Sequence, residues 1–181
     1  IVNIRKLLLF NDLNSIINKI KADNDFLAAC DQNGNSFLHW AAWLNLPVFC
    51  RFLLKNGIAP DIPGDQNDTP LHWAAANGNS DIMSLLLNSA GPHHSPPTHM
   101  GITPLHLSAG NGHMSVVKML LKKGASSDIP DKWGRLPLHY AVGTDQLNIV
   151  RLLIENMRDT LNRPDIYGQR PIHWAMQFGS T

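Results

Sequence analysis

Thr69-Pro70-Leu71-His72 decides the fold, because related stretches return at nearly constant distances along the 181 residues of the chain. The relatives read SFLH at 36–39, TPLH at 103–106, LPLH at 136–139 and RPIH at 170–173. Their histidines step by 33, 34, 33 and 34 residues, and a period of this size is typical of a repeat array. We therefore expect one elongated domain whose units pack on their neighbours.

Each of these stretches predicts the start of a helix. The Thr69 hydroxyl can accept a hydrogen bond from the first helical turn, and Pro70 suits the first helical position. The first helix should end six residues after each motif histidine, where a residue that tolerates a left-handed backbone always stands. These residues are Asn45, Gly78, Gly112, Asp145 and Gly179. An apolar segment with helical spacing follows, as at 116–121, and predicts a second helix packed on the first.

Helix, tight turn, helix and a glycine-marked loop at this period resemble the ankyrin repeat over residues 31–181. The resemblance implies an all-α repeat solenoid of helix-turn-helix units, in which β-hairpin loop fingers and first helices line a concave face. We expect N-terminal capping helices at 1–30, four repeats and a partial fifth. The repeats are expected at 31–63, 64–97, 98–130, 131–164 and 165–181.

The resemblance gives the recurring motif residues a structural role, in which each histidine bonds the cap hydroxyl and neighbouring backbone. These residues are Ser36, His39, Thr69, His72, Thr103, His106, His139 and His173. Leu136 and Arg170 stand at cap positions without a side-chain oxygen acceptor, so restoring Thr at each is predicted to add about 1 kcal/mol. Aromatic residues follow four of the histidines, and their regular recurrence at an apolar site indicates core positions. They are Trp40, Trp73, Tyr140 and Trp174.

No pattern in the sequence points to catalysis. Serine nucleophile arrangements, glycine-rich phosphate loops and paired acids at fixed spacing are absent. His93, His94 and His99 could converge on a divalent ion, but no Cys or Asp nearby would complete a four-ligand shell. We therefore interpret their segment as a polar loop, and expect neither a metal nor a cofactor nor an enzyme.

Composition and charge limit the cellular compartments and the classes of partner that are expected for the protein. No apolar run exceeds about five residues, which predicts a soluble chain without a membrane-spanning helix and without membrane contact. Cys30 and Cys50 cannot form a disulfide framework, so we expect a reducing compartment, cytoplasmic or nuclear. The net charge is +1, and residues 56–117 contain no Lys or Arg to contact phosphate, which argues against nucleic-acid binding. A monomer is expected.

Apolar and basic residues at fingertips and at the ends of first helices suggest a binding surface, because the fold does not need them there. Aromatic residues beside arginine have the composition of a binding hot spot. We predict that another protein docks across the last three fingers, with Trp133 as anchor and Arg135 pairing with an acid of the partner. The alternative is packing between fingers. The candidate residues are Trp43, Leu44, Met100, Ile102, Lys132, Trp133, Arg135, Tyr167, Gln169 and Phe178.

The primary hypothesis is thus a non-catalytic scaffold that presents a concave groove to a partner protein. Two more specific hypotheses compete with it. The Leu-His-Trp-Ala motifs and irregular repeat ends resemble the gankyrin type of proteasome assembly chaperone. The same motifs fit an ankyrin segment of a larger enzyme, such as an ankyrin-bearing palmitoyltransferase, or of a channel.

Overall fold

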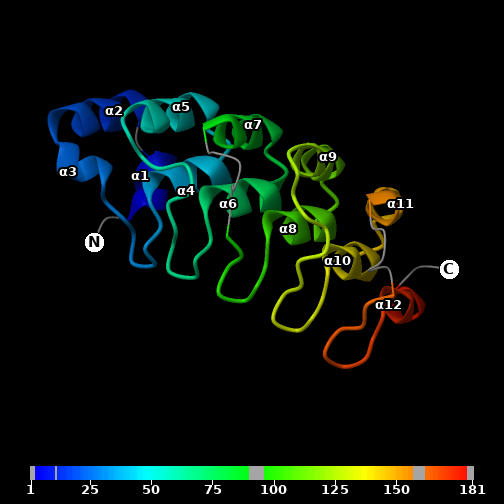
Figure 1. Ribbon diagram of the computed structural model, residues 1–181. Coiled ribbons are helices and arrows are strands. Elements are labelled where there is room, and N and C mark those ends of the chain that lie inside the picture. Colours follow the sequence, from blue (N-terminus) through cyan, green and yellow to red (C-terminus); the bar gives the residue numbers. More distant parts are fainter. Residues whose placement is uncertain (1–2, 11, 90–95, 157–161, 179–181) are drawn as a thin grey trace.

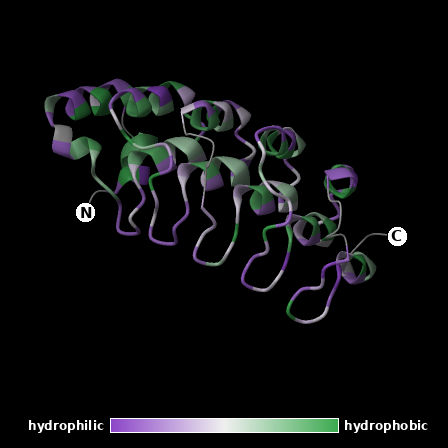
Figure 2. Ribbon diagram, viewed as in Figure 1, coloured by the Kyte–Doolittle hydropathy of each residue, from purple (hydrophilic) through white to green (hydrophobic). Residues whose placement is uncertain are grey.

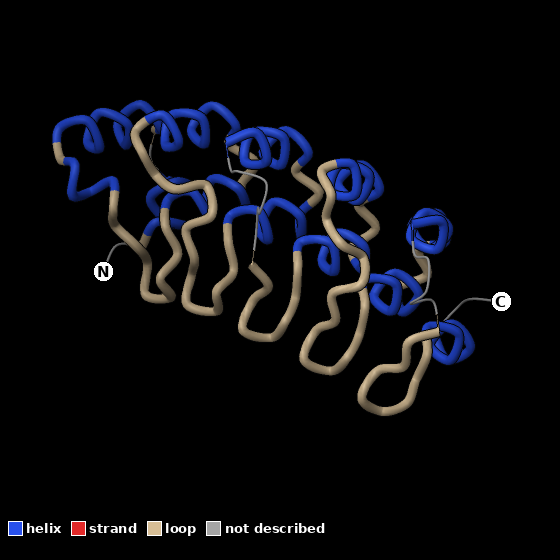
Figure 3. The backbone as a smooth tube through the Cα atoms, viewed as in Figure 1, coloured by secondary structure: helices blue, strands red, loops and turns tan. Residues whose placement is uncertain are grey.

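The computed structural model describes residues 3–10, 12–89, 96–156 and 162–178, and within them the chain forms helices and loops without a regular strand. The helices lie in two rows above a line of loops (Figure 1, Figure 3). The first-helix row comprises α1 (Ile4–Phe10), α4 (Phe37–Trp43), α6 (Pro70–Asn77), α8 (Pro104–Gly110), α10 (Pro137–Gly143) and α12 (Pro171–Phe178). The second-helix row comprises α2 (Leu13–Ala22), α5 (Pro47–Lys55), α7 (Ser80–Ser89), α9 (Met114–Lys122) and α11 (Leu147–Asn156), and α3 (Asn24–Leu27) connects α2 to the first finger.

The helices begin and end where local chemistry predicts. The Ser36 hydroxyl accepts a hydrogen bond from the Leu38 backbone N–H at 3.2 Å, and Thr103 accepts from His106 at 3.4 Å. After α4 and α10 the chain turns through a left-handed backbone at Asn45 (φ 53°) and Asp145 (φ 57°). Gly78 and Gly112 make the same turn after α6 and α8. The prediction for these four residues is confirmed, and Gly179 lies outside the described residues.

The core lies between the two rows and repeats with the sequence. Small side chains occupy one position of the first helices and are fully buried, which allows neighbouring helices to approach closely. They are Ala41, Ala74, Ser108 and Ala141. The second helices face them with larger apolar side chains at one repeated position. These are Phe49, Ile82, Val116 and Ile149, each at most 2% exposed. Stability therefore comes from contacts between neighbouring units.

The predicted fingers are present as hairpin-shaped turns (Figure 3). The fingers are numbered by the repeat that they open. Finger four, residues 131–135, is closed by the backbone N–H of Asp131, which donates to the Arg135 carbonyl at 2.9 Å. In the described residues the only strand-like pairing is an isolated antiparallel bridge between Cys30 and Ser36. Gly134 at the tip has φ 75°, and a Cβ atom there would lie 3.2 Å from the Cα atom of Asp165 in the next finger. Glycine is thus required both by conformation and by the close approach of the next finger.

Neighbouring fingertips are joined by backbone hydrogen bonds. Lys132 N–H donates to the Met100 carbonyl at 2.9 Å, and Ile166 N–H donates to the Trp133 carbonyl at 2.9 Å. The first two fingers are predominantly hydrophilic (Figure 2). The fingers therefore form one connected edge of the molecule, opposite the second-helix row.

Candidate functional site

The motif histidines connect each repeat to the next. His72 Nδ1 accepts the Thr69 backbone N–H at 3.1 Å, so its Nε2 carries the proton and donates to the Ile102 carbonyl at 3.0 Å. His106 repeats this arrangement with the Arg135 carbonyl at 3.0 Å. His39 and His139 reach the following finger in the same way. These bonds form a histidine ladder through the interior of the array.

Burial keeps the ladder histidines neutral. Removal from water, the largest contribution, lowers the pKa of both His72 and His106 to about 4. The same cause lowers the pKa of His39 and His139. A neutral, buried imidazole with both nitrogens hydrogen-bonded has no lone pair or proton to offer a substrate. The ladder is consequently structural.

Three of the predicted partner-binding residues take part in this ladder through their backbones. Ile102, Arg135 and Gln169 supply the carbonyls that accept from His72, His106 and His139. Their own N–H groups donate to a side-chain oxygen at the base of each finger. These bonds are Ile102 to Thr98 at 3.1 Å, Arg135 to Asp131 at 2.9 Å and Gln169 to Asp165 at 2.9 Å. The backbone at these positions belongs to the scaffold, whatever the side chains bind.

The Arg135 side chain is already paired inside finger four. Its Nε lies 2.7 Å from Asp131 Oδ2, and its guanidinium donates to the Tyr140 hydroxyl at 3.1 Å. The guanidinium also lies 4.4 Å from the centroid of the half-buried Trp133 ring. Tyr140 donates to Asp131 at 2.9 Å, and burial raises the pKa of its phenol. Arg135 thus closes a network within its own repeat.

The aromatic residues that follow the histidines are half-buried rather than fully enclosed, and they do more than fill the core. Trp40 Nε1 donates to Asp31 Oδ2 at 2.8 Å, and Trp174 Nε1 donates to Asp165 Oδ2 at 3.3 Å. Trp73 donates instead to Asp68, which stands four positions further along its finger than Asp31 and Asp165 do along theirs. Although burial opposes it, the Trp40 bond and backbone donors lower the pKa of Asp31. Interpreting these aromatics as core alone was therefore incomplete, because each ties a first helix to its finger.

Three tryptophans and an arginine line a hollow of about 190 Å³ on the first-helix row. The Trp73 ring stands edge-on to Trp40 and Trp43, with centroids 5.0 and 5.6 Å apart. The Arg5 guanidinium from α1 lies 5.8 Å from the centroid of Trp40. Trp43 is 45% exposed. The hollow therefore offers apolar ring surface with a cation at its edge.

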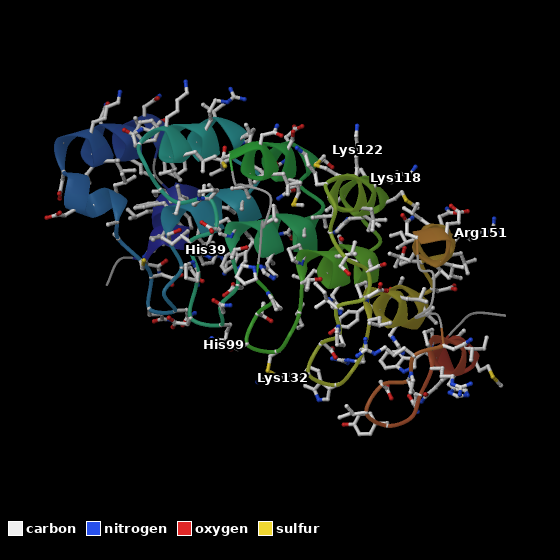
Figure 4. The ribbon with its side chains drawn as sticks, viewed as in Figure 1. His39, His99, Lys118, Lys122, Lys132 and Arg151 are labelled. Atoms are coloured by element: carbon white, nitrogen blue, oxygen red, sulfur yellow. The ribbon has the colours of Figure 1, made fainter. Side chains whose placement is uncertain are left out.

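The predicted partner-binding residues fall into two groups. Trp43 lies at the hollow, and Leu44 follows it as the half-buried C-cap of α4. The others on fingers three to five are Met100, Ile102, Lys132, Trp133, Arg135, Tyr167 and Gln169. Tyr167 is 72% exposed, and Figure 4 shows Lys132 at a fingertip. The Phe178 side chain lies outside the described residues.

The described part of the chain contains no group of three or more His, Cys, Asp or Glu side chains that could hold a metal ion. His93 and His94 lie outside it, and His99 is exposed on a fingertip (Figure 4). Among the same residues, every helix is too short or too polar to cross a membrane.

Comparisons with known proteins agree with the architecture. The family model for ankyrin repeats matches residues 3–95, 56–131, 92–163 and 125–181. Human palmitoyltransferase ZDHHC13 is 39% identical over 69 residues, 38% of this chain and 10% of that protein. Zebrafish (Danio rerio) palmitoyltransferase ZDHHC17 is 36% identical over 64 residues, 34% of this chain and 10% of that protein. Inversin-B of Xenopus laevis is 41% identical over 49 residues, 27% of this chain and 5% of that protein.

The matched stretches thus span a tenth or less of these relatives. The resemblance to the gankyrin type is not supported by these relatives. The repeats indicate a protein–protein interaction module. With the family model matching along nearly the whole chain, the protein belongs to the ankyrin-repeat family.

Proposed function

We propose that the protein is a non-catalytic binding module, and that the hollow between Trp40, Trp43 and Trp73 receives an apolar side chain of a partner protein. The observation that carries the proposal is the hollow itself, which exposes ring surface that the fold does not cover. Tryptophan is among the residue types enriched at the positions that dominate the binding energy of protein interfaces. The first helices and fingers would then form the concave groove around this anchor.

Arg5 defines the chemistry beside the anchor. It is exposed and forms no ion pair with a described residue. A carboxylate of the partner next to the apolar side chain would meet this cation at the edge of the hollow. The favoured ligand is therefore a segment with an apolar residue flanked by an acidic one.

The fingers are the alternative location. Tyr167 and Met100 offer apolar surface there, but the Arg135 charge is compensated by Asp131 at 2.7 Å. An arginine that already has a carboxylate gains less from an acid of the partner. Because of this difference, we place the proposed anchor site at the hollow and not at Trp133, where the sequence predicted it.

Peptides selected from a random library against the protein would test the location. We expect Trp43→Ala to weaken their binding at least about thirtyfold, as at a hot-spot aromatic, while urea unfolding changes by about 1 kcal/mol or less. Trp133→Ala is the matched control and should change affinity less than about threefold. Loss of binding in Trp133→Ala with full binding in Trp43→Ala would assign the site to the fingers instead.

The palmitoyltransferase relatives favour a more specific version, in which the chain is the ankyrin segment of a larger enzyme. The support is 39% identity over 69 residues to one of them. Sequencing the complete open reading frame would test this version, which requires that the frame also encodes a catalytic region.

A further inference from the structure

Charge is distributed unevenly between the second helices and the rest of the chain. The second-helix row carries seven Lys and Arg residues against Asp81 and Glu155, a net charge of +5. Since the whole chain carries +1, all remaining residues together carry a net charge of −4. The seven cations are exposed and are Lys19, Lys21, Arg51, Lys55, Lys118, Lys122 and Arg151.

Three of these cations are in register. Arg51, Lys118 and Arg151 occupy the same repeat position on α5, α9 and α11, and Ser84 occupies it on α7. Lys118 and Lys122 point outward from α9, and Arg151 lies on α11, whereas Lys132 lies at a fingertip on the opposite side (Figure 4). None of the seven forms an ion pair with a described residue. The row therefore presents uncompensated positive charge.

Exposed aliphatic side chains accompany these cations. Val48 on α5 is 72% exposed and precedes Arg51 by three residues, which places both on one helix face. On α11, Leu147 and Ile154 are 63% and 40% exposed within a turn of Arg151. In contrast, no aromatic side chain on the second-helix row is exposed.

This combination identifies the kind of anionic partner. Proteins that bind single-stranded nucleic acid use aromatic side chains on which bases stack, and the row offers none. Lysine and arginine interleaved with aliphatic side chains suit the interface of a bilayer, where the cations meet acidic headgroups and the aliphatic groups meet the acyl boundary. The four helices from α5 to α11, at a spacing of 8–10 Å, extend over roughly 30 Å, which is wider than one headgroup.

We propose that the second-helix row contacts a bilayer containing anionic phospholipids. The fingers then point away from the membrane, and the hollow on the first-helix row stays accessible to a protein partner. The contact is peripheral and electrostatic, so it needs no membrane-spanning segment. It goes beyond the proposed protein-binding function and does not depend on it.

Sedimentation with vesicles tests the proposal. The protein should pellet with vesicles made of about one third phosphatidylserine and two thirds phosphatidylcholine. It should not pellet with vesicles of pure phosphatidylcholine. Raising the salt concentration should release it, because screening shortens the reach of surface charges. Equal pelleting with both kinds of vesicle, or with neither, would refute the proposal.

Two variants of equal total charge locate the contact. Reversing Arg51, Lys118 and Arg151 to Glu should weaken vesicle binding at least about a hundredfold, given about fivefold for each cation lost. The control reverses the exposed Lys6, Lys132 and Arg170 to Glu and should weaken it much less. Circular dichroism and urea unfolding must show that both variants fold. Equal losses in the two would show that total charge, not the row, is responsible, and binding of a single-stranded oligonucleotide but not vesicles would also overturn the proposal.

Discussion

The hollow and finger four both combine an arginine with aromatic rings, but they differ in what the arginine meets. In finger four, Asp131 lies 2.7 Å from Arg135, and the centroids of the Trp133 and Tyr140 rings lie 4.4 and 5.0 Å from the guanidinium. In the hollow, Arg5 lies 5.8 Å from the Trp40 ring and has no ion pair among the described residues. The same residue types therefore close a scaffold in one place and leave a surface open in the other. The position of one carboxylate makes this difference.

Acid should break both regions together, because each rests on a ladder histidine. Trp73 packs edge-on against His39, with centroids 5.5 Å apart, and Tyr140 packs against His106 at 5.1 Å. His72 and His106 have a pKa of about 4 in the fold, against about 6.5 in the unfolded chain. Between these values the unfolded chain binds protons that the folded chain excludes, so stability falls as pH falls. The full loss is about 3 kcal/mol for each of the two, of which about 2 is reached by pH 5.

Urea unfolding from pH 7 to pH 5 measures this effect before most carboxylates titrate. The free energy of unfolding should fall by about 4 kcal/mol in total for the two histidines. His99→Asn, at an exposed fingertip, should show the same dependence. A free energy that stays constant over this range would mean that the ladder histidines tolerate the charged form.

Asp131→Ala should separate the two regions by destabilising finger four alone. Its Oδ1 accepts the N–H groups of Trp133 and Arg135, both at 2.9 Å, and its Oδ2 accepts from Arg135 and Tyr140. Removing the carboxylate leaves these donors and a partly buried cation unpaired, at a cost of about 3 kcal/mol. Asp65→Ala, at an exposed site, should change unfolding by about 0.5 kcal/mol or less.

The peptides proposed to bind at the hollow supply a second measurement on Asp131→Ala. Their affinity should be unchanged at a temperature where the variant is folded, because Asp131 lies in another repeat. A small change in unfolding, comparable to that of Asp65→Ala, would mean that the network in finger four contributes little and that Arg135 is available to a partner.

Local chemistry made the fold predictable from the sequence. A residue that tolerates positive φ recurs six residues after each motif histidine, and Asn45, Gly78, Gly112 and Asp145 all adopt it. Helices were also expected within residues 1–30, where α1 and α2 are found. Such features depend on neighbours within a few positions, so a single sequence carries them.

The candidate site depends on contacts between distant segments and was only partly predictable. Arg5 reaches Trp40 from a helix that carries no repeat motif, and no spacing rule connects the two. The finger-base acceptors did leave a signal, since Asp31, Thr98, Asp131 and Asp165 stand at corresponding positions of their repeats. The positive charge of the second-helix row left a weaker signal in the sequence. Charges counted along consecutive residues combine the second helices with the first helices and fingers between them.

Leu136→Thr should have the smallest effect, and it concerns the helix cap that directly follows finger four. The sequence alone predicts a gain of about 1 kcal/mol from a restored hydroxyl. In the structure, however, Leu136 is 0% exposed, and its N–H already donates to His139 Nδ1 at 3.0 Å, as Thr103 does to His106 at 3.1 Å. Threonine would add the hydroxyl but remove buried methyl and methylene groups, each of which contributes about 0.8 kcal/mol. We therefore expect a net loss of about 1 kcal/mol, opposite in sign to the sequence-based prediction.

Arg170→Thr provides the matched control for this sign. Arg170 holds the same cap position in the next repeat and also donates its N–H to His173 Nδ1 at 3.0 Å, but it is exposed. Threonine there gains the hydroxyl without removing buried apolar surface, so a stabilisation of up to about 1 kcal/mol is expected. Thermal unfolding of the two variants side by side should shift the midpoints in opposite directions. A rise of the midpoint in both variants would show that the cap hydroxyl contributes more than the buried leucine side chain. A hydroxyl cap would then stabilise the helix after finger four, as Thr69 and Thr103 do after fingers two and three.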